Sequence, residues 1–162
     1  MIKPLFQNVL VMVNGTEASF NAVRYAVLMA KLYRSRVHAL YVVDTATIKL
    51  LALNPICVEE ERLAYERSLA DNGERNLAYV REIGNAKGVV IETELRRGAI
   101  WSETIAMAAE RKIDVILIGS SGTEAGGSNE IASSTFKSVL ANARCSLLVV
   151  REQMVEQLYK LA

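Results

Sequence analysis

A short segment in the second half of the chain combines the residue types that bind phosphate. It opens with the apolar, β-branched run from Asp114 to Ile118 and continues into a loop in which glycines recur, starting with Gly119 and Gly122. Glycine lets a backbone turn sharply and approach a ligand closely. A helix is predicted to begin near Glu130, with its free N–H groups and positive dipole end directed back at the loop. The segment therefore has the composition of an anion-binding loop.

Glycine-rich loops have a second, purely structural explanation. Open α/β sheets commonly place glycines between a strand and a helix only to make the turn, so the pattern alone leaves both alternatives open. Gly126 and Gly127 fit a flexible loop equally well.

The sequence carries no recognisable catalytic signature. It contains no GxxxxGK[ST] loop, no GxSxG turn and no HExxH helix. Cys57 and Cys145 lie far apart without a CxxC pair, and His38 is the only histidine. This arrangement indicates reduced structural thiols and a packed or surface histidine. We therefore expect neither a catalytic residue nor a protein-bound metal.

Length and composition narrow the class of protein. The chain has 162 residues, of which 51% are hydrophobic, and we expect one domain spanning residues 1–162. Its 19 basic and 18 acidic residues are nearly balanced and form no basic cluster interleaved with aromatic residues, so no nucleic-acid partner is expected. No apolar stretch is long enough to span a membrane, and the first residues do not resemble a secretory signal. A soluble cytoplasmic protein is expected.

Apolar runs and helical periods alternate along the chain. Strands are expected over residues 8–13, 36–44, 89–95, 114–118 and 145–150, with helices between them. This alternation predicts an open, doubly wound, five-stranded parallel sheet of the Rossmann-like type, with strand order 3-2-1-4-5 and helices on both faces. Ligands bind such sheets beyond the carboxyl ends of the strands, where the strand order switches. Strands one and four end there, at Asn14-Gly15 and Gly119-Ser120.

The connecting segments are expected to differ in character. Thr16 is predicted to cap a first helix that ends near Arg34. After strand two we expect an apolar loop around Leu50, Leu53, Pro55 and Ile56, and then a long charged helix that begins at Glu59. The buried side of that helix is assigned to Leu63, Ala70, Leu77 and Val80.

The tail, residues 152–162, is predicted to form a short helix. Its apolar side is assigned to Met154, Val155, Leu158 and Leu161. A helix this short is marginal alone and has to dock, either on its own domain or on a second subunit.

The loop spacing and four further segments resemble the universal stress protein family. In that family Gly, two residues, Gly, nine residues and Gly-Ser wrap the phosphates of ATP, and Gly119, Gly122 and Ala132-Ser133 match this spacing. The segments VLVMVNGTEAS, LYVVD, RRGAIWSETI and CSLLVV resemble the family's opening strand, the end of strand two, the turn before helix three and the closing strand. Together they cover nearly the whole chain.

The resemblance implies a nucleotide site and a dimer. Asn14, Gly15 and the backbone of Val42 would contact the adenosine. The phosphates of ATP, with any Mg²⁺ bound mainly by those phosphates, would contact the residues of the loop and helix start, namely Gly119, Gly122, Ala132, Ser133 and Ser134. The family further implies a homodimer formed through the last strand, with an unidentified protein partner.

Three positions depart from the family pattern. Ala132 replaces the third glycine, Asn14 replaces an aspartate, and Ser146 replaces a proline in the last strand. If each of the first two costs about 1 kcal/mol, nucleotide affinity falls roughly thirtyfold without disappearing. The main hypothesis is a regulatory protein that binds an adenine nucleotide. The alternatives are a nucleotide-free, dimeric interaction module and, less favoured, a slow ATP hydrolase.

Three further side chains have a structural and a functional explanation. Trp101 opens a helix with an apolar stripe, which favours packing over adenine stacking. Arg96 and Arg97 end strand three on the ligand side, where one of them could reach a phosphate; a pair of solvated arginines is the simpler expectation.

Overall fold

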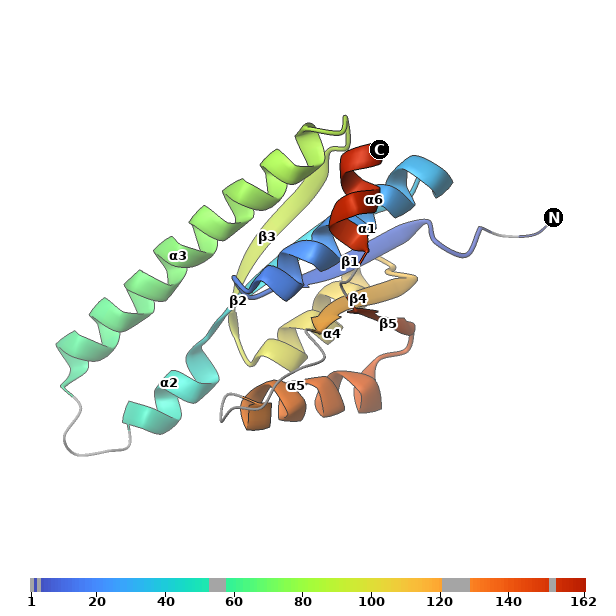
Figure 1. Cartoon of the computed structure of the whole chain (residues 1–162). Coiled ribbons are helices and arrows are strands. Elements are labelled where there is room, and N and C mark those ends of the chain that lie inside the picture. The colour runs from blue at the N-terminus through green and yellow to red at the C-terminus, as the bar shows by residue number, and fades with distance from the viewer. Residues whose placement is uncertain (1, 3, 53–57, 121–128, 152–153) are drawn as a thin grey trace.

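Five strands form a single parallel sheet in the computed structural model, which describes residues 2, 4–52, 58–120, 129–151 and 154–162. The strands lie in the order β3-β2-β1-β4-β5 (Figure 1). Their bounds are β1 Asn8–Val13, β2 Arg36–Asp44, β3 Ile91–Gly98, β4 Val115–Ser120 and β5 Ser146–Arg151. The predicted sheet type and strand order are confirmed.

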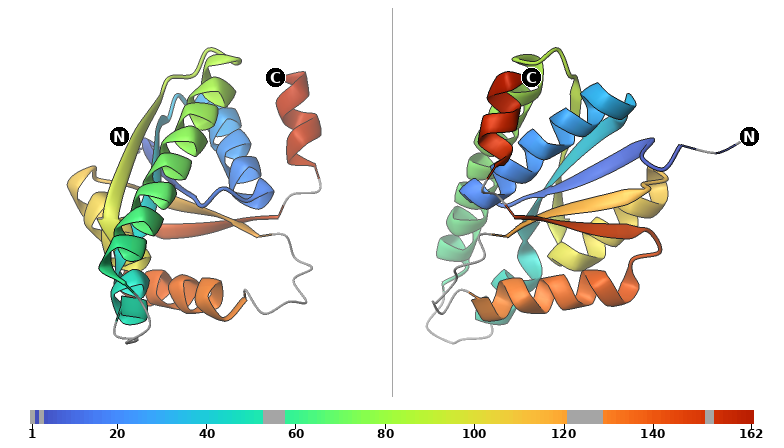
Figure 2. Two further views of the ribbon diagram at one scale, coloured as in Figure 1. Left: turned by 90° about the vertical axis from the view of Figure 1, so that its left-hand side faces the viewer. Right: turned by 45° about the vertical axis from the view of Figure 1, so that its right-hand side comes forward.

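The helices divide between the two faces of the sheet. Their bounds are α1 Glu17–Tyr33, α2 Thr45–Ala52, α3 Glu59–Asn85, α4 Ile100–Glu110, α5 Asn129–Asn142 and α6 Val155–Leu161. Helices α1 and α3 cover one face, and α4 and α5 lie on the other (Figure 2). The chain steps in one direction from β1 to β3 and then returns past β1 to β4, so right-handed crossovers place the later helices on the opposite face.

The central strand β1 has neighbours on both faces, which explains its continuous apolar sequence. Val9 and Val11 belong to the core beneath α1 and α3. Leu10 points the other way and packs with Met107 of α4 and Val139 of α5. Successive strand residues face opposite sides, so a strand buried on both has apolar residues at every position.

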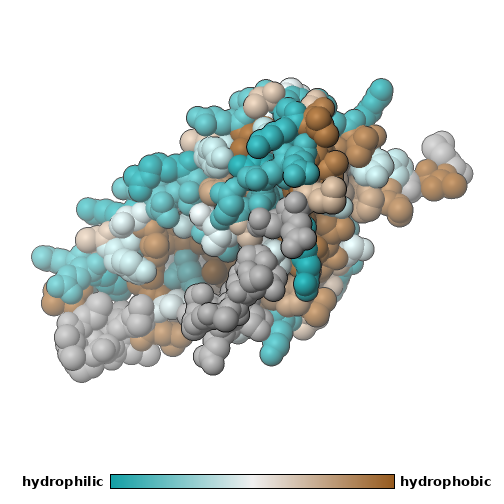
Figure 3. All heavy atoms as spheres, in the orientation of Figure 1, coloured by the Kyte–Doolittle hydropathy of each residue, from teal (hydrophilic) through white to brown (hydrophobic). Residues whose placement is uncertain are grey.

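Two expectations about the segment after β2 are wrong. Leu50 belongs to helix α2 and not to a loop, because Asp44 caps that helix: its carboxylate accepts from the Thr47 backbone at 3.1 Å and from the Thr47 hydroxyl at 2.6 Å. Leu53, Pro55 and Ile56 lie outside the described residues. Leu63 of α3 is 42% exposed, whereas Leu77 and Val80 are buried as expected. Hydrophilic residues predominate on the side of α3 that Figure 3 shows, with apolar residues scattered among them.

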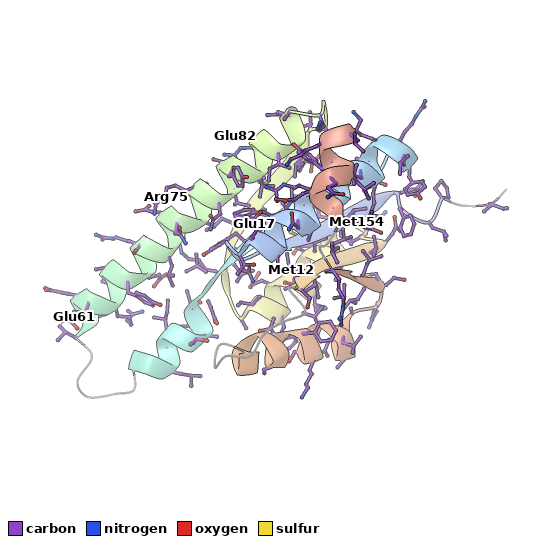
Figure 4. The ribbon with its side chains drawn as sticks, viewed as in Figure 1. Met12, Glu17, Glu61, Arg75, Glu82 and Met154 are labelled. Atoms are coloured by element: carbon purple, nitrogen blue, oxygen red, sulfur yellow. The ribbon has the colours of Figure 1, made fainter. Side chains whose placement is uncertain are left out.

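Helix α6 packs against its own domain. Val155 is buried, the Tyr159 hydroxyl donates to the Ile83 carbonyl at 2.7 Å, and Glu156 lies 3.8 Å from Arg24 of α1. Met154, at its start in Figure 4, is exposed.

The predicted apolar side of the tail is therefore wrong in part. Leu158 and Leu161 are exposed together with Met154, because the neighbouring helices contact the side of α6 that carries Val155 and Tyr159. None of the helices in the described ranges is long and apolar enough to cross a bilayer.

Strand β3 begins later than expected. Its bounds are Ile91–Gly98, whereas residues 89–95 were predicted, because the α3–β3 turn extends through Val89, whose N–H donates to the Gly84 carbonyl at 2.9 Å. The strand therefore reaches Arg96 and Arg97 before it ends.

Candidate functional site

The turn after β1 is held by a short chain of hydrogen bonds. The Ser19 N–H donates to the Thr16 hydroxyl at 3.2 Å, and that hydroxyl donates to Asn14 Oδ1 at 2.6 Å. The Thr16 backbone N–H donates to the same Oδ1 at 3.1 Å. Thr16 is thus the N-cap of α1, as predicted. Asn14 is therefore part of the same hydrogen-bonded turn.

Gly15 occupies a conformation that favours glycine. Its φ is +84°, in the left-handed region, and a Cβ there would lie 2.8 Å from Nδ2 of Asn76. Helix α3 therefore packs directly against the turn. Nδ2 of Asn76 is buried and has no hydrogen-bond partner among the described residues, a feature that could not be predicted from the sequence. Its only sequence signal is a polar residue one position before the buried Leu77.

Gly119 of β4 lies in close contact with the first turn of α1. A Cβ at this position would lie 2.1 Å from the carbonyl oxygen of Ala18 and 2.9 Å from the backbone nitrogen of Ser19. The end of β4 therefore lies directly against the first turn of α1. Glu17, labelled in Figure 4, belongs to that turn. The absence of a side chain at Gly119 allows this approach, whatever ligand role the residue has.

The remaining predicted site residues are described to different extents. Val42 lies near the carboxyl end of β2, opposite Arg96 of β3. Gly122 lies outside the described residues. Ala132 and Ser133 belong to α5, but their side chains are outside the described part of the structure, and Ser134 of α5 is exposed. The predicted helix start near Glu130 is confirmed, since α5 begins at Asn129.

The two arginines at the end of β3 are paired with carboxylates. Arg96 contacts Glu94 at 2.8 Å and also Glu103 and Glu110, and its side chain is only 14% exposed. These hydrogen bonds raise the pKa of Arg96 and lower that of Glu110. Arg97 lies 3.4 Å from Glu66. The expectation of solvated arginines is therefore wrong for Arg96, whereas the Arg97 side chain is 54% exposed. A phosphate would have to compete with these glutamates.

His38 and Trp101 lie away from the turns that follow β1 and β4. His38 is buried in β2, 3.3 Å from Glu92, and burial lowers its pKa. Trp101 lines a groove of about 400 Å³ between α4 and the turn before β5, together with Ile105 and Cys145. Burial raises the pKa of the Cys145 thiol. The expectation of a packed side chain is confirmed for His38, whereas Trp101 is 39% exposed.

The described part of the candidate site consists of backbone groups, the neutral side chains of Asn14, Thr16 and Ser19, and Glu17, whose carboxylate is paired with Arg24 at 2.8 Å. The turn at Asn14, the first turn of α1 and the end of β4 meet at the strand-order switch, where α/β sheets bind ligands. The first N–H groups of a helix and its positive dipole end favour an anion. An arrangement of this kind can hold a phosphorylated ligand without a basic side chain.

Comparison with known proteins agrees with the fold. The model of the universal stress protein family matches residues 5–151. The universal stress protein MJ0531 of Methanocaldococcus jannaschii is 28% identical over 152 residues, which are 94% of this chain and 86% of that protein.

Solved structures share the fold at lower identity. The universal stress protein UspA from Lactobacillus plantarum superposes with a TM-score of 0.72 at 22% identity, covering 90% of this chain and 98% of its own. A family member from Arabidopsis thaliana, solved with AMP bound, gives a TM-score of 0.62 at 14% identity over 93% of this chain and 94% of its own. Because the family model spans nearly all of the chain, this protein belongs to the universal stress protein family.

Proposed function

We propose that this protein is a regulatory, homodimeric universal stress protein that binds an adenine nucleotide, with ATP as the expected form, in the crevice beyond β1 and β4. The observation that carries the proposal is the close contact between Gly119 and the first turn of α1. It brings the glycine-containing end of β4 beside a capped helix N-terminus and the Asn14 turn. The turn that would hold the adenosine and the strand end from which the phosphate-binding loop would start therefore lie side by side.

The proposed contacts divide between the two ends of the nucleotide. Asn14, Gly15 and the backbone of Val42 would hold the adenosine. The phosphates would bind along the loop after β4 and the start of α5, at Gly119, Gly122, Ala132, Ser133 and Ser134. Mg²⁺, where present, would be bound mainly by the phosphates. The AMP-bound family member from Arabidopsis thaliana supports a nucleotide site on this fold.

The homodimer is proposed to form through β5. This strand is the last in the sheet order and pairs with β4 on one side only, so its other edge can pair with a second chain. Val149 of β5 is 40% exposed, which gives that edge an apolar contact. The cytoplasmic location and the protein partner remain predictions from the sequence.

Calorimetric titration with Mg-ATP on nucleotide-stripped protein tests the proposal. We expect saturable binding that Mg-GTP, the control for adenine recognition, does not reproduce. The paired substitution Asn14→Asp with Ala132→Gly restores the family pattern, and we expect it to tighten ATP binding at least several-fold. No heat of binding in either protein would refute the nucleotide site.

A nucleotide-free interaction module is the second candidate. One observation favours it: Asn14 Oδ1 already accepts two hydrogen bonds from Thr16 and is thus partly withdrawn from a ligand. On that account neither the natural protein nor the paired variant binds ATP, yet the protein is still a dimer by sedimentation.

A further inference from the structure

A groove of about 380 Å³ lies at the amino ends of β2 and β3. The turn from α1 into β2 forms one wall, and the turn from α3 into β3 forms the other. Figure 2 shows the end of α1 and the α3–β3 turn together at one end of the molecule. Because the strands are parallel, this groove and the turns that follow β1 and β4 lie at opposite ends of the strands.

Two arginines in the first wall carry charges that no described carboxylate neutralises. Arg34 and Arg36 are exposed, and neither side chain forms an ion pair or a hydrogen bond with a described residue. Two lysines lie beside the groove. Lys31 Nζ donates to the Lys87 carbonyl at 3.3 Å, and Lys87 Nζ donates to the Lys160 carbonyl at 3.4 Å. Carbonyl oxygens satisfy these ammonium groups without cancelling their charge, so the groove is surrounded by cations.

The second wall is apolar and carries a carboxylate. Val89 and Val90 line it, and Val90 is 80% exposed. Among the described lining residues Glu92 is the single acidic one, and its Oε2 lies 3.3 Å from His38 Nδ1. The groove therefore combines an exposed apolar contact with two unpaired guanidinium groups.

The groove also adjoins an unpaired strand edge. Strand β3 is at one end of the sheet order and pairs with β2 alone among the described strands. Its other edge offers backbone N–H and C=O groups, and Glu92 belongs to this strand. An extended polypeptide can use both the edge and the groove, whereas a small anion would use only the arginines.

We propose that this groove binds an acidic segment of a partner protein, with carboxylates beside Arg34 and Arg36 and an apolar side chain against Val90. Charge complementarity selects the occupant, because positive surfaces attract acidic partners and repel basic ones. Nucleic acid fits less well: the described lining residues include no aromatic ring on which bases could stack, and Glu92 would repel phosphates. The groove lies away from the proposed nucleotide crevice, so this inference goes beyond the proposed function and does not depend on nucleotide binding.

An NMR titration of the isotope-labelled full chain tests both the location and the sign of the interaction. The probe is a synthetic peptide of alternating glutamate and leucine residues, and its matched control has lysine in place of each glutamate. The acidic peptide should shift the amide signals of Arg36, Val90 and their neighbours in a saturable manner. The lysine peptide should leave these signals in place. Added salt should weaken binding, because the attraction is electrostatic.

Two variants should change the affinity for the acidic peptide in opposite directions. Arg34→Gln with Arg36→Gln should weaken binding by about tenfold or more, because both guanidinium charges are lost. Glu92→Gln should tighten it by about threefold, because the repelling carboxylate is removed while the side-chain shape is kept. The control is Arg75→Gln on the exposed surface of α3, labelled in Figure 4, which should leave the affinity unchanged.

Three results would overturn the inference. Equal weakening by the double variant and by Arg75→Gln, or shifted signals away from the groove, would mean that the peptide responds only to overall charge. If phosphatidylserine vesicles or a single-stranded oligonucleotide shift the groove signals and the acidic peptide does not, the occupant is not an acidic protein segment. If the acidic peptide shifts no signal, the groove does not bind such a segment, and the proposed nucleotide site is unaffected.

Discussion

Replacement of Gly119 by alanine should destabilise the protein through a backbone clash. The added Cβ would lie 2.1 Å from the carbonyl oxygen and 2.4 Å from the carbonyl carbon of Ala18. Neither atom belongs to a flexible side chain, so the first turn of α1 or the end of β4 has to move by more than about 1 Å. Overpacking of this kind typically costs 1–3 kcal/mol, and we expect about 3 kcal/mol here.

Urea unfolding followed by circular dichroism measures this cost. The matched control is Gly88→Ala, where a Cβ meets no heavy atom within 4 Å but φ is +72°. That substitution should cost only the backbone strain of about 1 kcal/mol. We expect Gly119→Ala to be clearly the more destabilising of the two, while the slope of the unfolding free energy against urea concentration stays unchanged. Equal losses would mean that the approach of β4 to α1 is not a tight contact.

Two other predictions concern α6 and the histidine. Tyr159→Phe leaves the Ile83 carbonyl without its 2.7 Å donor and should lower the free energy of unfolding by about 1 kcal/mol, while Tyr65→Phe on exposed surface of α3 should change it little; equal effects would count against the docking contact. His38 is the only histidine, and burial lowers its pKa, so NMR titration of its imidazole should give a value below the ordinary 6.5. Its neutral form then contributes stability that is complete above that ordinary value and is lost as the pH falls below it. A pKa above the ordinary value would mean that Glu92 outweighs burial.

The sheet could be predicted from the sequence because each strand is a short apolar run between helical periods. Residues 8–13 and 36–44 match β1 and β2 as observed. Thr16 could also be identified as a cap, since a hydroxyl before an amphipathic run is a local signal. Features of this kind depend on neighbours in the sequence, and for that reason the structure agrees with the prediction.

Other features depend on tertiary contacts that one sequence does not display. Helix α2 was missed because its cap, Asp44, is also the last residue of β2. The buried side of α6 was assigned from apolar residues alone, whereas Tyr159 packs inward and Leu158 does not. A helix of two turns has too few positions for periodicity to identify the contact side.

The candidate site shows the same limit. The strand order predicted that the turns after strands one and four lie at the same switch point, and Gly119 does lie against Ala18, in the first turn of the helix that follows Asn14. The sequence could not show that Gly119 is required for packing, nor that Asn14 turns its oxygen toward Thr16. Both depend on distances between backbone atoms of different elements.

The most direct test of the central claim is to denature freshly purified protein and identify any released nucleotide by mass spectrometry. We expect an adenine nucleotide in the extract. The Gly119→Ala protein should release a smaller amount, because the first turn of α1 is displaced in it. A protein that releases no nucleotide, and that also gives no heat with Mg-ATP, would contradict the claim that this crevice binds an adenine nucleotide.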